Sequence, residues 1–336
     1  MTQQSGPSPC DAGALHITLD ELRARAPLWK ATWVAVGNFD GVHTGHQRIL
    51  RRAVAEAGGD AVAVALTFHP HPQAVVGSGP PPALTSVADR CAQIRALGIQ
   101  CAVCLRFDRA VASLTPEEFV GQVLVDGFAA RGVVVGYNFR FGHRAQGTPA
   151  QLQALGQVHG FLVRVEDAVR LDGEVVSSSL VRRRLREGDV EQAARLLGRP
   201  FRLAGRVVAG EGRGRELGFP TANVAPEPGM LLPGQGVYRV RLRAGDGPGL
   251  PAVASISSRP TFAGNDVALE VHVLDFAGDL YGQRVEVEFL DRLRGIVRFS
   301  SAQELCRQIE RDVAEARTRF ARAPVAPAAP PPAQSG

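Results

Sequence analysis

The chain reads GNFDGVHTGHQ at residues 37–47, where the apolar run ATWVAVG (31–37) passes through a glycine-containing turn into a helix-like segment. A buried strand that leads into a helix in this way is typical of an α/β domain with a parallel sheet, whose ligands bind at the carboxyl ends of the strands. His43 and His46 are three residues apart at the helix start and therefore lie on one side of it. Free amide groups at a helix N-terminus attract anions, and two imidazoles beside them can donate to a triphosphate. The stretch therefore predicts nucleotide phosphate binding and favours nucleotidyl transfer.

Two other interpretations of His43 and His46 stay open at this stage. Asp40 is near enough in sequence to complete a metal site with the two histidines. The histidines could also lie on the surface without any ligand. We favour phosphate binding because the Gly-Asn-Phe-Asp-Gly turn directly precedes them.

Short apolar runs alternate with helix-like segments from about residue 32 to residue 164. Four further valine-rich runs predict buried strands, at residues 61–68, 101–107, 131–139 and 159–165. Three segments between them carry apolar residues at helical spacing, at residues 46–57, 86–97 and 116–125. The alternation indicates βαβ units that form one parallel sheet.

The pattern changes near residue 187. A helix-like segment at 188–198 comes first, and strand-like runs separated by glycine and proline follow it, at residues 202–210, 236–244, 251–258, 268–276 and 284–293. Such runs predict an antiparallel barrel or sandwich. Ser301 and Glu304 have the capping-box spacing at the start of a last amphipathic helix. We therefore predict two domains, at residues 14–186 and 187–322, between disordered ends at 1–13 and 323–336.

The composition excludes several classes of protein. Of the 336 residues, 45% are apolar and 21% are charged, as in globular chains, and the formal net charge is +5. Lys30 is the single lysine, and every other basic residue is arginine. A P-loop NTPase is excluded because it needs a lysine on the phosphates, and a Schiff-base enzyme is excluded unless Lys30 is its nucleophile. The sequence has no apolar run long enough for a transmembrane helix and no signal-peptide pattern at its N-terminus.

The five cysteines are an odd number, which argues against a disulfide framework and for a cytoplasmic location. Cys101 and Cys104 form a CxxC pattern inside an apolar run, with no second pair and no histidine nearby. We expect two small buried residues there and no zinc or redox site.

Two loops after predicted strands carry polar side chains. His71 lies in FHPHP, whose prolines predict a rigid turn that could bring it to the site or leave it solvated. Asn138 lies in GYNFRFG, where Phe139 and Phe141 offer flat faces to an aromatic ring. Aromatic residues at strand ends are more often part of the core, so this loop is a weak signal by itself.

The segment SSSLVRRRLREG (177–188) puts hydroxyl groups at a helix start and arginines along the helix. The serines and Arg182 could hold phosphates opposite the histidines. Ser179 is also a reasonable N-cap of the helix, and the arginines also fit a solvated face or a nucleic-acid patch.

The second half carries the segment GRGRELGFPTAN (212–223), whose glycines allow a close backbone approach to phosphate. Thr221 and Asn223 present two oxygens to one side of an extended chain, and such oxygens suit Mg²⁺. Glu270 alternates with His272 on a predicted strand, so it could accept a proton from an alcohol as a general base. The alternatives are a glycine-rich hairpin and a solvated strand glutamate.

These motifs occur in an order that resembles the prokaryotic bifunctional riboflavin kinase/FMN adenylyltransferase (FAD synthetase) family, over roughly residues 32–320. The resemblance implies an α/β Rossmann-like nucleotidyltransferase domain, followed by a small antiparallel Greek-key β-barrel domain with a C-terminal helix. It also implies two ATP-dependent reactions: riboflavin is phosphorylated to FMN, and FMN is adenylylated to FAD with release of pyrophosphate.

The resemblance also assigns site residues. In the first domain, His43 and His46 would be catalytic, and the ATP and FMN site would contain Asn38, Phe39, His71, Asn138, Ser177, Ser178, Ser179 and Arg182. In the second, Glu270 would be catalytic, Thr221 and Asn223 would bind Mg²⁺, and the ATP and flavin site would contain Gly212, Gly214, Arg215, Gly218, Pro220, Thr221 and Asn223. Two positions depart from the family pattern: Leu180 replaces a charged residue, and Ser257 replaces a glycine that we place in a turn.

We therefore expect a cytoplasmic enzyme with small-molecule substrates, a weak homo-oligomer at most, and neither a nucleic-acid nor a membrane partner. Mg²⁺, ATP, riboflavin, FMN and FAD are the expected ligands. Two competing hypotheses are a different small-molecule nucleotidyltransferase fused to a barrel, which the second half argues against, and an arginine-rich nucleic-acid-binding protein, whose binding would depend steeply on salt.

Overall fold

The computed structural model describes residues 14–25, 31–77, 79–210, 214, 217–245, 247–261 and 264–322. The two ends that we predicted to be disordered lie outside these ranges, as do Lys30, Gly212 and Arg215. The chain divides into two compact units. The first contains the residues up to Arg183 together with 195–199 and 229–231, and the second contains the rest. The domain boundary at 186/187 stays a prediction.

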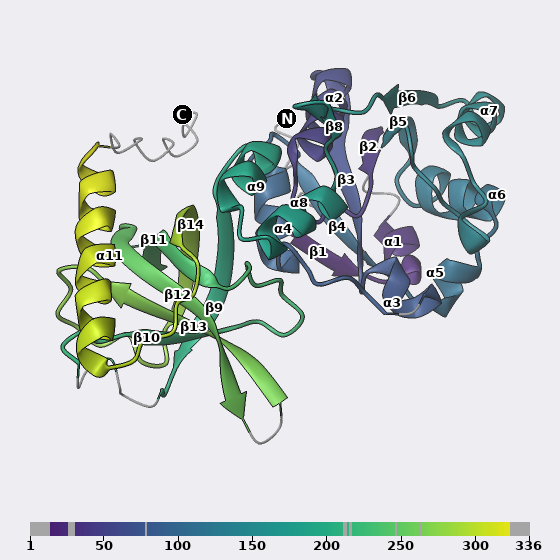
Figure 1. Cartoon of the computed structure of the whole chain (residues 1–336). Helices are drawn as coiled ribbons and strands as arrows, with labels where there is room; N and C mark the ends of the chain where they lie inside the picture. Colours follow the sequence, from purple (N-terminus) through teal and green to yellow (C-terminus); the bar gives the residue numbers. More distant parts are fainter. Residues whose placement is uncertain are drawn as a thin grey trace, which may run out of the picture. The chain divides into compact units, whose positions relative to one another are not determined.

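The first unit contains a six-stranded parallel sheet in the order β1-β4-β3-β2-β5-β6 (Figure 1). Its strands are β1 (Ala14–Ile17), β2 (Thr32–Val36), β3 (Val62–His69), β4 (Cys101–Arg106), β5 (Ala130–Gly136) and β6 (Leu162–Glu166). Five of the six are the valine-rich runs of the sequence, so the predicted parallel α/β sheet is confirmed. The strand β1 was missed, because four residues are too short to show a pattern.

Helices follow the strands, as the βαβ pattern requires. They are α1 (Leu19–Arg25), α2 (Thr44–Ala57), α3 (Pro72–Val76), α4 (Val87–Arg95), α5 (Arg109–Ser113), α6 (Pro116–Phe119), the π-helical η2 (Val120–Val125), the short η3 (His143–Ala145) and α7 (Pro149–His159). The hairpin β7 (Arg170–Leu171) and β8 (Glu174–Val175) precedes α8 (Ser178–Arg186) and α9 (Val190–Leu197). Across the described residues, no helix combines the length and apolar character that crossing a bilayer requires.

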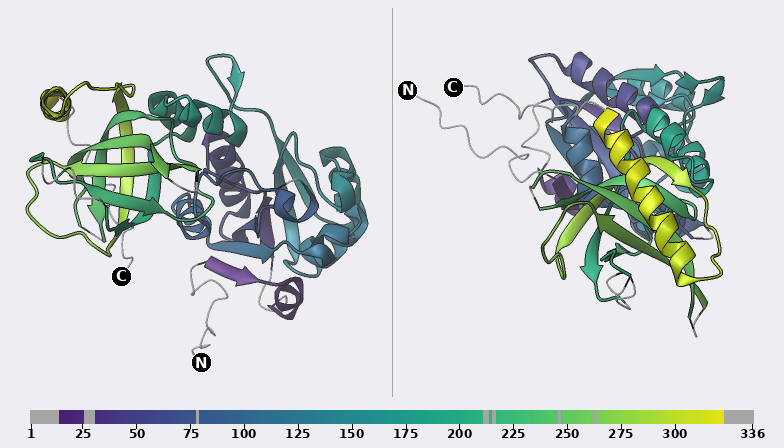
Figure 2. Two further views of the ribbon diagram at one scale, coloured as in Figure 1. Left: turned by 60° about the horizontal axis from the view of Figure 1, so that its bottom comes forward. Right: turned by 60° about the vertical axis from the view of Figure 1, so that its left-hand side comes forward.

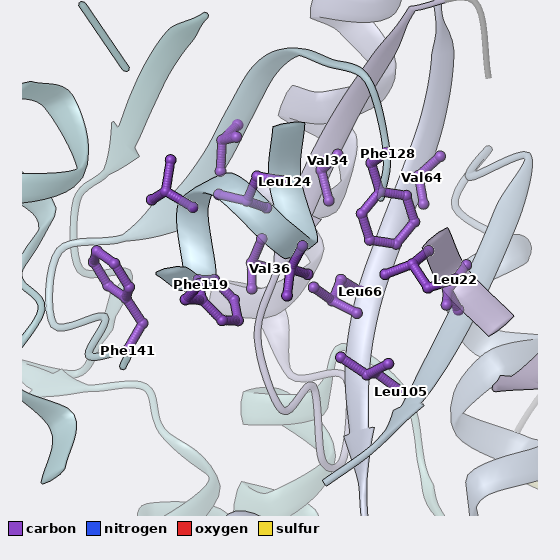
Figure 3. Close-up of a cluster of buried hydrophobic side chains, with 14 of the residues drawn as sticks. Leu22, Val34, Val36, Val64, Leu66, Leu105, Phe119, Leu124, Phe128 and Phe141 are labelled. Carbon is purple, nitrogen blue, oxygen red and sulfur yellow. The ribbon is translucent and has the colours of Figure 1, made fainter. Parts of the chain in front are cut away.

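The sheet has a hydrophobic core on each face. Alternate residues of β2 point to opposite faces: Val34 and Val36 lie in one core, and Trp33 and Ala35 in the other. The first core contains Leu22 of α1 and much of α6 and η2, and its packing is drawn in Figure 3. The second contains residues of α2 and α4. Cys101 and Cys104 are buried in the sheet, which confirms the prediction of two small buried residues.

The second unit is a closed antiparallel barrel in the order β10-β13-β12-β11-β14-β9, with α11 packed beside it (Figures 1 and 2). Its elements are β9 (Phe201–Val208), β10 (Ala222–Pro226), β11 (Gly236–Ala244), β12 (Leu250–Thr261), β13 (Gly264–Val273), β14 (Arg284–Arg294) and α11 (Ala302–Arg322). The predicted barrel is confirmed. The turn predicted at Ser257 is wrong, because Ser257 lies within β12 opposite Ala268, where it continues the strand ladder.

The helix α11 is attached to the barrel by both apolar and charged contacts. Ala316 is fully buried against Val237 and Val253 of the barrel. Arg294 of β14 forms a bidentate ion pair with the buried Asp312 of α11, with Nη2 2.7 Å from Oδ2. A bidentate, mostly buried pair fixes orientation better than an exposed one, so α11 forms a defined wall on this side of the barrel.

Candidate functional sites

The loops at the carboxyl ends of β2, β3, β5 and β6 surround one cavity of about 1090 Å³ in the first unit. This is the edge of a parallel sheet at which α/β proteins bind ligands. The cavity brings together all the predicted site residues of this half: Asn38, Phe39, His43, His46, His71, Asn138, Ser177, Ser178, Ser179 and Arg182. The four sequence motifs that carry them therefore converge on one place.

The loop between β2 and α2 has an unusual backbone. Phe39, Gly41 and Val42 have φ values of 48°, 82° and 43°. Glycine accepts a positive φ readily, but the β-branched Val42 does so at a cost of order 1–3 kcal/mol. Phe39 is fully buried in the core under the loop, so its ring anchors the loop and only the edge of the residue borders the cavity. Such a conformation persists only where the surrounding structure holds it.

Asp40 is the central anchor of this loop. Its buried carboxylate accepts hydrogen bonds from the backbone of Leu84 and Thr85 and from Arg182, whose Nη2 lies 2.5 Å from Oδ2. Ser178 donates to the Asp40 carbonyl at 2.9 Å. Because these donors occupy both carboxylate oxygens, Asp40 does not complete a metal site with the histidines. Arg182 also donates from Nε to a backbone carbonyl and is itself buried, so it supports the loop from behind.

Arg90 of α4 holds the preceding residue of the loop. Its Nη1 donates to the carbonyl of Asn38 at 2.9 Å and to Thr67 Oγ1 at 3.2 Å. The Asn38 side chain lies 3.4 Å from Nε2 of His71, so this contact also joins the two loops that flank the cavity. Sequence reasoning missed Arg90, because the sequence of α4 indicated only an amphipathic helix.

His43 is the N-cap of α2, and its Nδ1 accepts a hydrogen bond from the backbone N–H of His46 at 3.2 Å. Burial, together with the positive charges of Arg182 and Arg199, lowers the pKa of His43 to about 4. The ring is therefore neutral at pH 7, and because Nδ1 is an acceptor, its proton is on Nε2 and can be donated into the cavity. The surface-histidine interpretation is wrong, since His43 is only 6% exposed.

His46 stacks on His43 with ring centroids 3.5 Å apart. Burial, followed by the charge of His43 and of nearby arginines, lowers its pKa well below 6.5. Within the described ranges, Nδ1 of His46 is buried without a hydrogen-bond partner. No group of three or more His, Cys, Asp or Glu side chains suited to a metal occurs among the residues that the structure describes. The two rings are therefore neutral at pH 7 and lie at the N-terminus of α2, a position that favours anions.

The serine segment leads into α8 and borders the same cavity as the histidines. The predicted N-cap Ser179 is wrong: the hydroxyl of Ser177 accepts the backbone N–H of Leu180 at 3.2 Å, so the helix begins two residues earlier. Ser179 is left exposed at the cavity. Leu180 is 7% exposed, so the residue that departs from the family pattern serves packing. Arg183 pairs with Glu174, which argues against an open basic patch on this helix.

The GYNFRFG loop contributes one face to the cavity and one to the core. Phe141 is buried and stacks on Phe139, with ring centroids 5.5 Å apart. Phe139 is partly buried and borders the cavity together with Asn138. An aromatic residue backed by the core offers a rigid face on which a planar ring can stack.

In the second unit, Asn223 of β10 is the direct cross-strand partner of Glu270 on β13. Ser255 of β12 is opposite Glu270 on its other side. Directly opposite residues have their side chains on the same face, so a hydroxyl, a carboxylate and an amide lie in a row across three strands. Ser255 was missed, because register is a property of the folded sheet.

Glycines pack closely against the predicted metal-binding side chains. A Cβ atom at Gly210 would lie 2.0 Å from the amide of Asn223, and one at Gly214 would lie 3.0 Å from Oγ1 of Thr221. A side chain at Gly210 would displace the Asn223 amide, and one at Gly214 would also meet the carbonyl oxygen of Phe219 at 2.5 Å. Gly210 and Gly214 therefore lie against Asn223 and Thr221, and glycines allow such a close backbone approach. Gly218 has a φ of 84°, which glycine adopts without strain.

His272 attaches the segment between Gly218 and Asn223 to β13. Its Nδ1 lies 2.8 Å from the carbonyl oxygen of Pro220, which can only accept, so the ring donates. Phe219 packs edge-on against the same ring, with centroids 5.8 Å apart. Both residues border a cavity of about 550 Å³ whose far wall is α11, with Glu310 and Arg317.

Comparison with known proteins matches the two halves of the chain to two different families. The family model for FAD synthetase matches residues 26–180, and the model for riboflavin kinase matches residues 197–320. A bifunctional riboflavin kinase/FMN adenylyltransferase of Pseudomonas fluorescens is 44% identical over 84% of this chain and 91% of its own length. The Escherichia coli K12 protein of the same name is 39% identical, over 85% of this chain and 92% of its own.

A solved structure also matches across both units. It is a Streptococcus pneumoniae protein described as a macrolide-efflux protein, which is 29% identical. Its fold matches with a TM-score of 0.82, over 91% of this chain and 99% of that one.

Proposed function

The chain belongs to the family of bifunctional riboflavin kinases/FMN adenylyltransferases, and from this premise we propose how its residues phosphorylate riboflavin to FMN and adenylylate FMN to FAD. The observation that carries the proposal is that both halves match, in order and over nearly the whole length of the curated relatives. A different nucleotidyltransferase fused to a barrel would leave the second match unexplained.

The first unit carries out adenylylation. A phosphate oxygen of FMN attacks the α-phosphorus of ATP, the bond between the α-phosphorus and the bridging oxygen breaks, and pyrophosphate leaves. The protein forms no bond to the substrate in this step, so its contribution is to position the reactants and stabilise charge. The cavity of about 1090 Å³ is large enough for two nucleotide-sized substrates.

His43 and His46 bind the ATP phosphates as neutral donors. The lowered pKa of His43 and its Nδ1 acceptor role support donation from Nε2. Asn38, His71 and Asn138 complete the polar lining. At the start of α8, Ser179 presents its exposed hydroxyl to the nucleotide, while Ser177 caps the helix and Ser178 donates to the Asp40 carbonyl. For Phe39 and Arg182 we propose indirect roles, since the first anchors the loop and the second holds Asp40.

The second unit carries out phosphorylation. Glu270 accepts the proton of the ribityl 5′-hydroxyl while this oxygen attacks the γ-phosphorus of ATP; the bond between the γ-phosphorus and the β–γ bridging oxygen breaks, and ADP leaves. The position of Asn223 next to Glu270 supports this assignment. Thr221 and Asn223 would hold Mg²⁺, which neutralises charge on the transferring phosphoryl group. The oxygen donors fit this ion, because Mg²⁺ at a phosphate site takes few ligands from the protein. Gly214 and Gly218, with Gly212 and Arg215 outside the described ranges, belong to the segment that we place over the phosphates.

We also propose a cytoplasmic location. The described cysteines Cys91, Cys101, Cys104 and Cys306 form no disulfide with one another, and burial raises the pKa of Cys104 to about 12, which supports chemically inert residues in a reducing compartment.

The test is turnover by the full-length protein. With riboflavin, ATP and Mg²⁺, we expect FMN to appear first and FAD to follow, resolved by chromatography; with FMN and ATP, FAD and pyrophosphate appear together. A chelator should stop the phosphorylation of riboflavin, for which Thr221 and Asn223 would hold Mg²⁺. Absence of FMN in the first assay refutes the kinase assignment, and absence of FAD in the second refutes the adenylyltransferase assignment. Tight, salt-dependent nucleic-acid binding without turnover would favour the competing class.

A further inference from the structure

Among the residues that the structure describes, the buried arginine of α4 has no partner of opposite charge. Arg90 is 7% exposed, and its hydrogen bonds go to neutral oxygens: the carbonyls of Asn38 and Phe68 and the hydroxyl of Thr67. In the part of the chain that the structure describes, no carboxylate lies within ion-pair distance of it, and its Nε is buried without a partner. Buried charges in proteins are nearly always paired, so this one calls for a counter-charge.

The contacts of Arg90 lead to the nucleotide cavity. Asn38 and Phe68 belong to the two strand ends that border it, and Thr67 Oγ1 also donates to the Asn38 carbonyl at 2.9 Å. Arg90 itself does not line the cavity. Arg90 therefore acts through Asn38 and Phe68, which border the cavity and accept its hydrogen bonds.

The histidines of the cavity respond to this charge. Burial is the main cause that lowers the pKa of His46 and of His71, and the positive charge of Arg90 lowers both further. Asp40, the nearest buried carboxylate of the loop, is already paired with Arg182. The positive potential of Arg90 consequently extends into the cavity instead of being cancelled within the protein.

We propose that Arg90 is a positioning residue of the adenylyltransferase site, which sets Asn38 and the β3 end for substrate and whose counter-charge is the polyphosphate of bound ATP. The proposal rests on the adenylyltransferase function proposed above. It explains why an arginine is buried here without an acid: the ion pair is completed only when the anionic substrate enters.

Full-length variants test the proposal by steady-state adenylylation of FMN. Arg90→Met removes charge and donors, and we expect the KM for ATP to rise about tenfold and kcat to fall by about tenfold or more, as for the loss of charged hydrogen bonds. Arg90→Lys keeps the charge and should restore the KM for ATP to within about threefold while kcat stays low. Arg95→Met, at the exposed end of the same helix, should behave as wild type. Riboflavin phosphorylation by the second unit should be unchanged in all three.

An unchanged KM for ATP in Arg90→Met overturns the proposal, and so does an equal rise in Arg90→Lys. If Arg90→Met does not fold, Arg90→Gln replaces it, because glutamine keeps hydrogen-bond donors without the charge. Equal KM values for ATP in Arg90→Gln and Arg90→Lys overturn the proposal. A higher KM for ATP in Arg90→Gln supports it. Failure of the adenylyltransferase assignment itself looks different, because wild-type protein would then make no FAD from FMN and ATP.

Discussion

Arg182 and Asp40 form a buried ion pair between α8 and the loop that follows β2, with Nη2 2.5 Å from Oδ2 and less than a tenth of either side chain exposed. The sequence motifs suggested Arg182 as a phosphate ligand and left Asp40 open as a metal ligand. The structure shows that they bind each other. The pair joins the histidine motif to the serine motif, which are about 140 residues apart in sequence.

Asp40→Asn should destabilise the first unit. It leaves Arg182 buried without an anion, and breaking a buried pair in this way typically costs about 3–5 kcal/mol. Both tryptophans of the chain, Trp29 and Trp33, lie in the part of the sequence that matches FAD synthetase, so urea unfolding followed by tryptophan fluorescence reports on that part. FAD formation should be lost and FMN formation kept. Asp60→Asn, at an exposed turn, is the matched control, and equal stability of the two variants would contradict this role.

A fragment of residues 184–322 should phosphorylate riboflavin. It contains the closed barrel, α11 and the Glu270 site, and it keeps the hydrogen bond from the Gly234 N–H to the Leu185 carbonyl at 2.7 Å. A fragment that begins at residue 200 lacks this bond and should be less stable. FMN production by the purified fragment is the measurement. A folded but inactive fragment would show that the kinase needs the first unit.

The fold was more predictable than the site. Valine-rich strands and glycine-rich turns can be recognised in the sequence. They predicted five of the six strands of the sheet, and they predicted the barrel. The short β1 cannot be recognised in this way, because it depends on pairing with β4. The motifs of the first unit line one cavity, but the roles of Arg90 and Arg182 depend on which backbone atoms lie beside them after folding. Ser177 caps α8, where the sequence predicted Ser179. The sequence could not distinguish them, because neighbouring serines have the same N-cap propensity.

His43 should make the first unit sensitive to acid. Its pKa is about 4 in the folded chain, mainly through burial, and near 6.5 when unfolded. Between these values the unfolded chain binds more protons, so stability falls as the pH drops through this window, by up to about 3 kcal/mol in total. His43→Gln cannot titrate, so its stability relative to wild type should improve from pH 7 to pH 4. Urea unfolding by tryptophan fluorescence measures this, and parallel pH curves would contradict it.

His272 should set the Mg²⁺ requirement of the kinase. It holds the carbonyl of Pro220, one residue before Thr221, at 2.8 Å. His272→Leu loses this bond, worth about 1 kcal/mol, and we expect the Mg²⁺ concentration for half-maximal FMN formation to rise about fivefold. His272→Asn keeps a donor near the position of Nδ1 and should stay close to wild type. If the two variants behave alike, the hydrogen bond is not what positions the metal-binding segment.

Glu270 occupies the middle of a row of polar side chains on the barrel, between Asn223 and Ser255. A carboxylate beside an amide and a hydroxyl can be held in one orientation, which a general base needs. The competing interpretation is a solvated strand glutamate, whose orientation would not matter for the reaction.

Glu270→Gln should separate these interpretations, because the amide fills the same space and cannot accept the proton of the riboflavin hydroxyl. General-base catalysis contributes about 10²–10⁴-fold, so kcat for riboflavin phosphorylation should fall by that factor. Riboflavin binding should change little, and adenylylation of supplied FMN should stay near the wild-type rate, since that cavity lies in the first unit. Glu227→Gln, which removes an exposed carboxylate of the same unit, is the matched control. A kinase rate equal to that of the control would remove Glu270 from the mechanism and leave the hydroxyl to lose its proton to the transferring phosphate itself.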